Sequence, residues 1–322
     1  MNTHTQKKEK WLMTFVCSVV CATMIILVTF PLQGYAAQIK QKTFASPEEA
    51  VKALVDAAKS ENQEELMAIF GPAGREVLSS GDAVDDKAVK EQFLKAYEVK
   101  HALIREGDAK AVLQIGTEEW PFPIPLVKKN QQWLFDTKKG KEEMNYRRIG
   151  RNELSTIQAC LAYVDAQREY AAKDRDGDGL FEYAQKFWST PGKKDGLYWE
   201  AKPGEEESPL GDFAARATGE GYKKTSNKPV PYHGYFFKIL KAQGRNAPGG
   251  AYDYIVNGRM IGGFGMVAHP ANYGVSGVMT FVVNHDGIVY EKNLGKDTTK
   301  IARAMKLFNP DKTWKKVETK SE

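Results

Sequence analysis

The sequence predicts an α+β protein built in two parts, a helix-and-sheet cone followed by a long helix packed on an antiparallel meander sheet. Helical signals fill much of residues 46–99, and strand signals follow over 110–136. A second succession, with helices first and strands after, occupies 152–292. Helices and strands in separate blocks are typical of α+β folds and not of alternating α/β folds.

Residues 1–36 have the layout of a secretory signal peptide. Three lysines lie within 7–10, an uncharged and mostly apolar run covers 11–32, and the small residues Gly34 and Ala36 follow at the −3 and −1 positions. The pattern predicts cleavage after Ala36 and a periplasmic or secreted protein. The alternative is an uncleaved anchor, because about 20 apolar residues can span a bilayer. A membrane partner is expected only in that case.

The composition is that of a folded protein, with 42% hydrophobic and 27% charged residues. Removing the leader leaves 43 basic and 40 acidic residues. So small an excess of positive charge gives no reason to propose a nucleic-acid partner. Removal of the leader also leaves Cys160 as the one cysteine, which cannot form an internal disulfide. Its helical spacing from apolar neighbours over 154–164 predicts a buried side chain.

The first part is expected to span residues 37–150. Ser46 caps a helix that begins at Pro47, and Glu49 completes a capping box. Further helices are predicted over 63–70 and 83–99, and strands over 110–115, 122–127 and 132–136 with a polar turn at 128–131. Helices followed by such a meander resemble the NTF2-like cone, in which a pocket between helix and sheet is common.

The second part is expected to span residues 151–322. The charged stretch 138–151 indicates a solvated linker, with a domain boundary near Gly150. The elements predicted after it are a long helix over 152–173, short helices over 181–188 and 212–218, and strands over 232–241, 262–268, 277–283 and 288–292. Asn284-His285-Asp286-Gly287 is a hairpin turn that joins the last two strands.

The stretch from Asp174 to Gly179 is the candidate ion site. Three alternating carboxylates, Asp174, Asp176 and Asp178, suit a hard cation, and Gly179 holds the sharp-turn position of a calcium loop. Leu180 would offer its carbonyl and Glu182 would take the ninth position. Gln185 stands where a bidentate glutamate is expected, which predicts a weak site. The alternative is an acidic turn without an ion.

Several stretches together resemble one family of secreted Gram-negative proteins, the domain of unknown function 2950 family. They are Phe44-Ala45-Ser46-Pro47-Glu48-Glu49-Ala50, Arg148-Ile149-Gly150-Arg151-Asn152-Glu153, Asp165-Ala166-Gln167-Arg168-Glu169-Tyr170, Gly277-Val278-Met279-Thr280-Phe281 and Asp286-Gly287-Ile288-Val289-Tyr290-Glu291-Lys292. The resemblance brings no known activity. The second part also resembles the globular heads of type IV pilins and pseudopilins, where a long helix packs on an antiparallel sheet.

These observations predict an exported, non-catalytic module that binds an envelope or extracellular partner and holds structural calcium. The alternative is a periplasmic hydrolase or a small-ligand binder that uses a pocket in the first part. Histidines and aspartates gathered around one cleft would favour the enzyme. A pocket filled by apolar side chains would favour the binding module.

Overall fold

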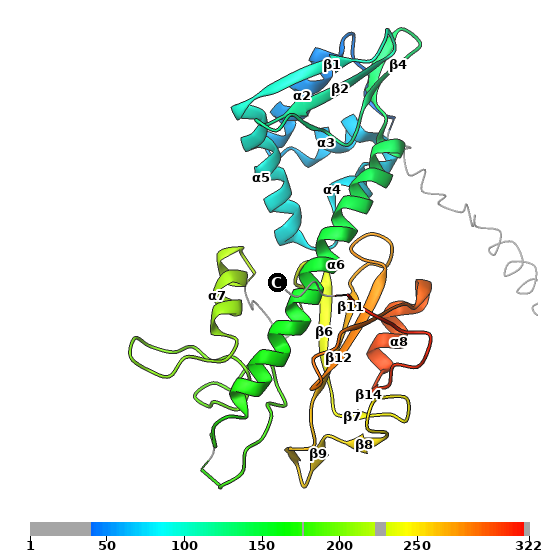
Figure 1. Cartoon of the computed structure of the whole chain (residues 1–322). Helices are drawn as coiled ribbons and strands as arrows, with labels where there is room; N and C mark the ends of the chain where they lie inside the picture. The colour runs from blue at the N-terminus through cyan, green and yellow to red at the C-terminus, as the bar shows by residue number, and fades with distance from the viewer. Residues whose placement is uncertain (1–39, 176, 223–229, 319–322) are drawn as a thin grey trace, which may run out of the picture. The chain divides into compact units, whose positions relative to one another are not determined.

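The computed structural model describes residues 40–175, 177–222 and 230–318. The predicted signal peptide and Asp176 therefore lie outside the described residues. Residues 39–322 group as one compact unit. Across the described ranges, every helix is too short or too polar to cross a membrane. Both helices and antiparallel sheets are present, so the predicted α+β class is confirmed (Figure 1).

The N-terminal half contains helices followed by a small antiparallel sheet. Its elements are α2 (Pro47–Lys59), α3 (Gln63–Phe70), η1 (Gly71–Ala73), α4 (Gly74–Leu78), α5 (Ala83–Val99), β1 (His101–Arg105), β2 (Lys110–Ile115), β3 (Trp120–Pro121), β4 (Leu126–Lys129) and β5 (Gln132–Phe135).

Helix α2 begins as its sequence predicts. The Ser46 side chain accepts a hydrogen bond from the Glu49 N–H at 3.1 Å, and the Glu49 carboxylate accepts one from the Ala45 N–H at 3.1 Å. Pro47 occupies the first turn, where its missing N–H removes no helical bond. The helix buries Ala50, Val51, Leu54, Val55, Ala57 and Ala58, which turns one apolar stripe toward the sheet.

The sheet of this half has the strand order β1-β2-β4-β5, and β3 pairs with β2. Strand β1 was not predicted. The strand predicted over 122–127 is wrong in its first half, because pairing resumes only at Leu126. Pro121, Pro123 and Pro125 have no N–H to donate to a ladder, so the chain between β3 and β4 runs along β2 without regular pairing.

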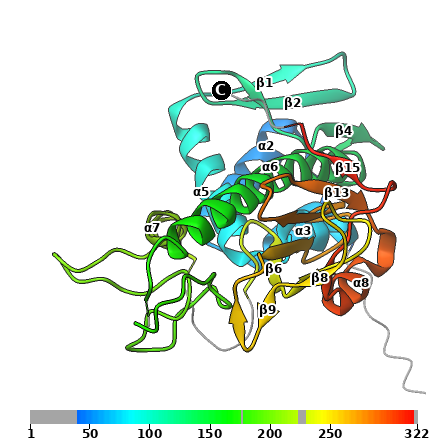
Figure 2. The same cartoon turned by 60° about the horizontal axis from the view of Figure 1, so that its bottom comes forward.

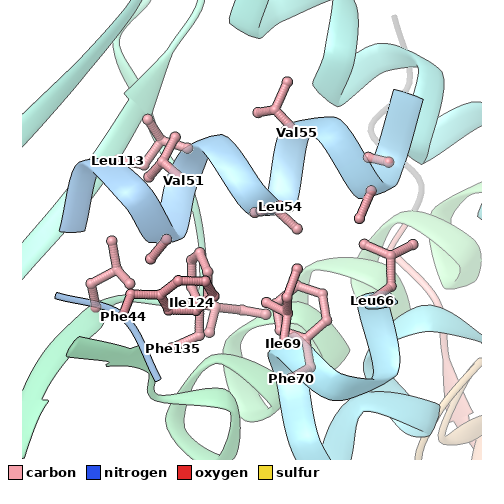
Figure 3. Close-up of a cluster of buried hydrophobic side chains, with 14 of the residues drawn as sticks. Phe44, Val51, Leu54, Val55, Leu66, Ile69, Phe70, Leu113, Ile124 and Phe135 are labelled. Carbon is pink, nitrogen blue, oxygen red and sulfur yellow. The ribbon is translucent and has the colours of Figure 1, made fainter. Parts of the chain in front are cut away.

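Apolar side chains fill the space between the helices and this sheet (Figure 3). Ile69 and Phe135 are fully buried, and Phe70 packs edge-on against Phe135 with ring centroids 5.6 Å apart. The other labelled side chains of this cluster are Phe44, Val51, Leu54, Val55, Leu66, Leu113 and Ile124. The space between the helices and the sheet, where the sequence pattern suggests a pocket, is therefore filled by the core.

Helix α6 (Thr137–Tyr170) is far longer than predicted. The interpretation of 138–151 as a solvated linker is wrong, because this stretch is helical. Asp136 caps the helix through the Lys139 N–H at 3.3 Å. Three of the basic residues that suggested a linker have acidic partners: Lys141 pairs with Glu76, Arg147 with Glu143 at 2.7 Å, and Arg151 with Asp85 at 3.1 Å.

The C-terminal half contains a second sheet with the order β15-β13-β12-β11-β6. Its elements are α7 (Gly211–Gly219), β6 (Tyr235–Leu240), β7 (Ala242–Gln243), β8 (Tyr252–Asp253), β9 (Ile255–Val256), β10 (Arg259–Met260), β11 (Gly265–Pro270), β12 (Met279–Asn284), β13 (Tyr290–Asn293), η2 (Gly295–Asp297), α8 (Thr298–Ala304), β14 (Leu307–Phe308) and β15 (Lys315–Lys316). The four predicted strands correspond to β6, β11, β12 and β13 with shifted ends.

Two helices pack on opposite faces of this sheet (Figure 1). On the α6 face, Cys160 is fully buried beside Tyr163 and Phe281, which confirms its predicted burial, and burial raises the pKa of its thiol to about 12. On the α8 face, Val267 and Ala302 belong to a separate apolar cluster. Strand β15 pairs with β13 at the sheet edge (Figure 2).

A lysine on β6 holds the end of α8. The Lys238 ammonium donates to the carbonyls of Ala302, Arg303 and Met305 at 3.1, 2.7 and 2.5 Å. These carbonyls belong to the last turn of the helix and to the residue after it. The Ala302 carbonyl also accepts the Met305 N–H at 3.2 Å, whereas the other two lie where the helical ladder has ended. The positive charge also opposes the negative end of the helix dipole.

Candidate functional site

The aspartate loop closes through its first carboxylate. Asp174 accepts hydrogen bonds from the N–H groups of Gly177 and Gly179, both at 2.8 Å, and Asp178 accepts one from the Leu180 N–H at 3.0 Å. Gly177 and Gly179 have φ angles of 77° and 86°, which glycine adopts without strain. The turn therefore depends on Asp174 and on the two glycines that follow it.

The loop is not followed by a helix. The helix predicted over 181–188 is wrong, because the backbone there bonds to other segments. The Tyr183 N–H donates to the Met260 carbonyl at 2.8 Å, and the Ala184 N–H donates to the Gln167 side-chain oxygen at 2.8 Å. The loop therefore lacks the second helix of a helix–loop–helix calcium site.

Two residues of the predicted calcium loop have other partners in this structure. One carboxylate oxygen of Asp178 pairs with Arg259. Gln185 donates to the Gly258 carbonyl at 2.7 Å and so faces the β9–β10 turn. Leu180 is exposed, and Glu182 is partly buried. Among the described residues, which exclude Asp176, acidic side chains do not form a group of three that could hold a metal.

Arg175, the second residue of the loop, is held by a set of contacts that we call the Arg175 clasp. The Arg175 guanidinium donates to the Tyr170 carbonyl at 3.2 Å and pairs with Glu206 at 2.8 Å. It also lies 4.8 Å from the Tyr170 ring centroid and 5.2 Å from that of Trp199. Because Tyr170 ends α6, this cation fixes the start of the loop to the helix.

A polar network missed by the sequence analysis surrounds Asp82. The buried carboxylate accepts bonds from the Tyr222 hydroxyl at 2.8 Å and the Gly234 N–H at 2.9 Å. Its other oxygen accepts the N–H groups of Val84 and Asp85 and so caps α5. Burial, together with the negative charge of Asp82, raises the pKa of the Tyr222 phenol well above its usual range.

This network joins segments that are far apart in sequence. The bonds of Asp82 reach 152 residues along the chain, and the Asn272 side chain donates to the Ser80 carbonyl at 3.0 Å. Gly234 is required here, since a Cβ would stand 2.7 Å from the Asn152 side-chain nitrogen. The described hydrogen bonds of the Asp82 carboxylate join it to the start of α5, to Tyr222 and to Gly234, so this carboxylate helps to hold these segments together.

A groove of about 330 Å³ lies on the outer side of the small sheet, against α6. Phe122 and three prolines form its apolar part, and Tyr146 is 72% exposed at its rim. The charged residues that line it are Lys110, Lys139, Glu142, Glu143 and Arg147. This groove, and not the filled interior, offers a concave surface in the first half.

Comparison with known proteins places the chain in a family. Residues 41–317 match the profile of the family described as "Protein of unknown function (DUF2950)". The chain belongs to this family. Neither a curated protein nor a solved structure matches it. The NTF2-like and pilin-like resemblances therefore stay predictions.

In this DUF2950 member, the sequence contained one signal for the missed network. Asp82 directly precedes the helix predicted over 83–99, which is the position of an N-cap. The pattern gives the cap but not the second carboxylate oxygen, whose partners come from residues 222 and 234. Only the folded chain brings them to Asp82.

Proposed function

We propose that the protein is a non-catalytic binding module that works in the periplasm or outside the cell and holds calcium as a structural ion. The filled interior of the N-terminal half carries this proposal (Figure 3). A hydrolase or small-ligand binder of the cone type needs that space for its substrate. Here Ile69, Leu113 and Phe135 occupy it, and each is at most 1% exposed.

Calcium is proposed for the loop from Asp174 to Glu182. Its support is the closed turn, in which the Asp174 carboxylate already faces two backbone N–H groups. The Arg175 clasp fixes one end of the loop before any ion binds. Arg259 competes for Asp178, so the site is weak, with a dissociation constant on the order of 10⁻⁴ to 10⁻³ M.

The test is thermal unfolding with calcium and with a chelator. An ion that binds only the folded state raises its stability by about 2.7 kcal/mol at roughly 100 times the dissociation constant. Asp176→Ala should abolish the rise in melting temperature. Arg259→Gln should increase it at the same calcium concentration, because it releases Asp178 and removes a positive charge. A wild-type melting curve that ignores both calcium and chelator contradicts the calcium proposal.

Export is proposed from the signal pattern of residues 1–36, which includes the basic segment, the apolar run and the small residues Gly34 and Ala36. N-terminal sequencing of the protein from its native host measures the cleavage site directly. A chain that begins at Ala37 is the expected result. Recovery of a membrane-bound form that begins at Met1 would contradict cleavage and show that the segment is an uncleaved anchor.

The second candidate is a small-ligand binder or a periplasmic hydrolase that uses the N-terminal half. The groove beside Tyr146 is the observation that favours it. An exposed aromatic ring next to charged side chains suits a ligand that is partly apolar and partly polar. Tyr146→Ala should then weaken binding of a ligand found by screening and leave the melting temperature unchanged, whereas an unchanged affinity would exclude this groove.

A further inference from the structure

The positive charge of the chain is concentrated near its C-terminus. Residues 292–316 contain eight of the 46 basic residues and two of the 41 acidic ones. The rest of the chain therefore has 38 basic and 39 acidic residues and is almost neutral. A segment of 25 residues that holds the whole positive excess needs an explanation beyond solubility.

Six of these cations lie on the α8 side of the second sheet. Tyr290 and Trp314 belong to the α8-side cluster, and side chains alternate along strands, so Lys292 and Lys316 share that face. The Lys292 ammonium lies 5.9 Å from the Trp314 ring centroid, which agrees with this placement. Val317 packs on the α6 side, which places Lys315 on the other face.

The remaining four cations lie in η2, in α8 and directly after α8. Lys296 in η2 and Lys300 and Arg303 in α8 are exposed, and Lys300 and Arg303 are three residues apart on one side of α8. The opposite side is buried through Thr298 and Ala302. Lys306 follows α8 at the rim of a groove. We call Lys292, Lys296, Lys300, Arg303, Lys306 and Lys316 the C-terminal basic surface.

None of these six cations forms an ion pair with a described residue. The contrast with α6 is direct, because Lys141, Arg147 and Arg151 there each have an acidic partner. Like charges spaced three or four residues apart on a helix destabilise it. The C-terminal basic surface therefore costs stability while its charge remains available to a partner.

An apolar groove of about 420 Å³ opens among these cations. Met305, Leu307 and Trp314 line it together with Lys306. Leu307 is 42% exposed, and Ile301 on α8 is 41% exposed. Exposed apolar side chains beside unpaired cations are the combination with which a protein surface meets anionic lipid, since the charges attract the headgroups and the apolar groups enter the boundary of the bilayer.

We propose that the C-terminal basic surface docks on an anionic phospholipid membrane. The cations extend over a strand, a helix and the edge strand β15, an area that a planar array of headgroups can contact at once and that one acidic peptide covers only in part. This membrane contact is peripheral and independent of the leader. It goes beyond the proposed function and does not depend on the calcium loop, so either can fail without the other.

The test is vesicle co-sedimentation of the chain beginning at residue 37, which leaves the compact unit of residues 39–322 intact. The chain is mixed with phosphatidylcholine vesicles, with or without phosphatidylglycerol, in the presence of a chelator. We expect binding only to the phosphatidylglycerol vesicles, and loss of that binding at high salt. The variant Lys296→Gln/Lys300→Gln/Arg303→Gln should bind at least about tenfold more weakly.

The matched control is Lys52→Gln/Lys59→Gln/Lys87→Gln, which removes three exposed helical cations that have acidic partners. It lowers the net charge equally and should bind as the wild type does. Circular dichroism melting checks that both variants fold. Equal weakening in both variants would reduce the effect to net charge and overturn the proposal. So would absence of vesicle binding by the wild type, or binding to polyglutamate alone.

Discussion

At the residue scale, the Glu206 carboxylate pairs with three cations. Lys173, Arg175 and Lys194 all donate to its carboxylate, at 2.7, 2.8 and 2.8 Å. These three cations hold the pKa of the Glu206 carboxyl far below its ordinary value of 4.5. A carboxyl with a lowered folded pKa stabilises the folded state above its unfolded pKa, and that stability is lost as the pH falls toward the folded pKa.

Glu206→Gln should therefore lower the free energy of unfolding most at neutral pH. The difference from the wild type should stay constant from about pH 7 to about pH 5 and shrink below the ordinary carboxyl pKa of 4.5, because the unfolded wild-type chain then takes up a proton that the folded chain does not. Urea denaturation at several pH values measures this difference. The matched control is Glu207→Gln at the exposed neighbour, which should be nearly neutral throughout. A pH-independent difference for Glu206→Gln would contradict the assignment.

Residue-scale prediction from sequence succeeded where a signal is local. The Ser46 cap of α2 and the burial of Cys160 in α6 each follow from residue spacing within a single helix. The second carboxylate oxygen of Asp82 could not be assigned, because its partners follow 140 and 152 residues later. For the aspartate loop, the turn residues could be predicted from the sequence, while the pairing of Asp178 with Arg259 depends on the position of β10.

At the element scale, α6 contains two glycines with opposite surroundings. A Cβ at Gly140 would stand 2.5 to 2.8 Å from atoms of Ile124, whereas a Cβ at Gly150 would meet nothing within 4 Å. Gly140→Ala should destabilise the protein by about 1 to 3 kcal/mol through overpacking. Gly150→Ala should stabilise it by up to about 1 kcal/mol, the helix-propensity difference.

Thermal and urea unfolding of these two variants decide between packing and propensity. The pair is its own control, since the same substitution is made at two positions of one helix. Stabilisation by both variants would mean that Ile124 shifts at little cost to make room for the added methyl group. Destabilisation by both would mean that α6 is not helical at Gly150 in solution.

The errors at the element scale have one physical origin. The density of lysine and arginine over 138–151 hid a helix, because the acidic partners Glu76 and Asp85 lie outside the window. Conversely, a short helix was expected over 181–188, where the backbone instead makes tertiary hydrogen bonds to Met260 and Gln167. The β12–β13 hairpin was predicted well, because its turn lies within four consecutive residues.

At the scale of the whole molecule, the predicted boundary near Gly150 falls inside α6. The helix continues on both sides of it, with Arg148 and Asn152 buried on either side. Arg148 donates to the Val77 carbonyl at 3.5 Å, whereas Asn152 donates to the Ser276 carbonyl at 2.9 Å. Helix α6 is thus hydrogen-bonded to residues of both halves, while the division into two domains stays a prediction.

A chain cut at Gly150 should therefore give two poorly stable fragments, 37–150 and 151–322. Each loses half of α6 and one side of the Asp82 network. Circular dichroism and limited proteolysis of the separate fragments measure this, with the uncut chain as reference. If both fragments melt cooperatively near the temperature of the intact chain, the halves are independent domains after all.

The Lys238 cap also constrains the order in which the chain can acquire its structure. Helix α8 has seven residues, too few to persist alone in water, and its cap comes from a strand more than 60 residues earlier. The helix can therefore form only after β6 has been placed beside β11. Its amide protons should become protected from solvent exchange together with those of the sheet, and α8 should open whenever β6 detaches from the sheet edge.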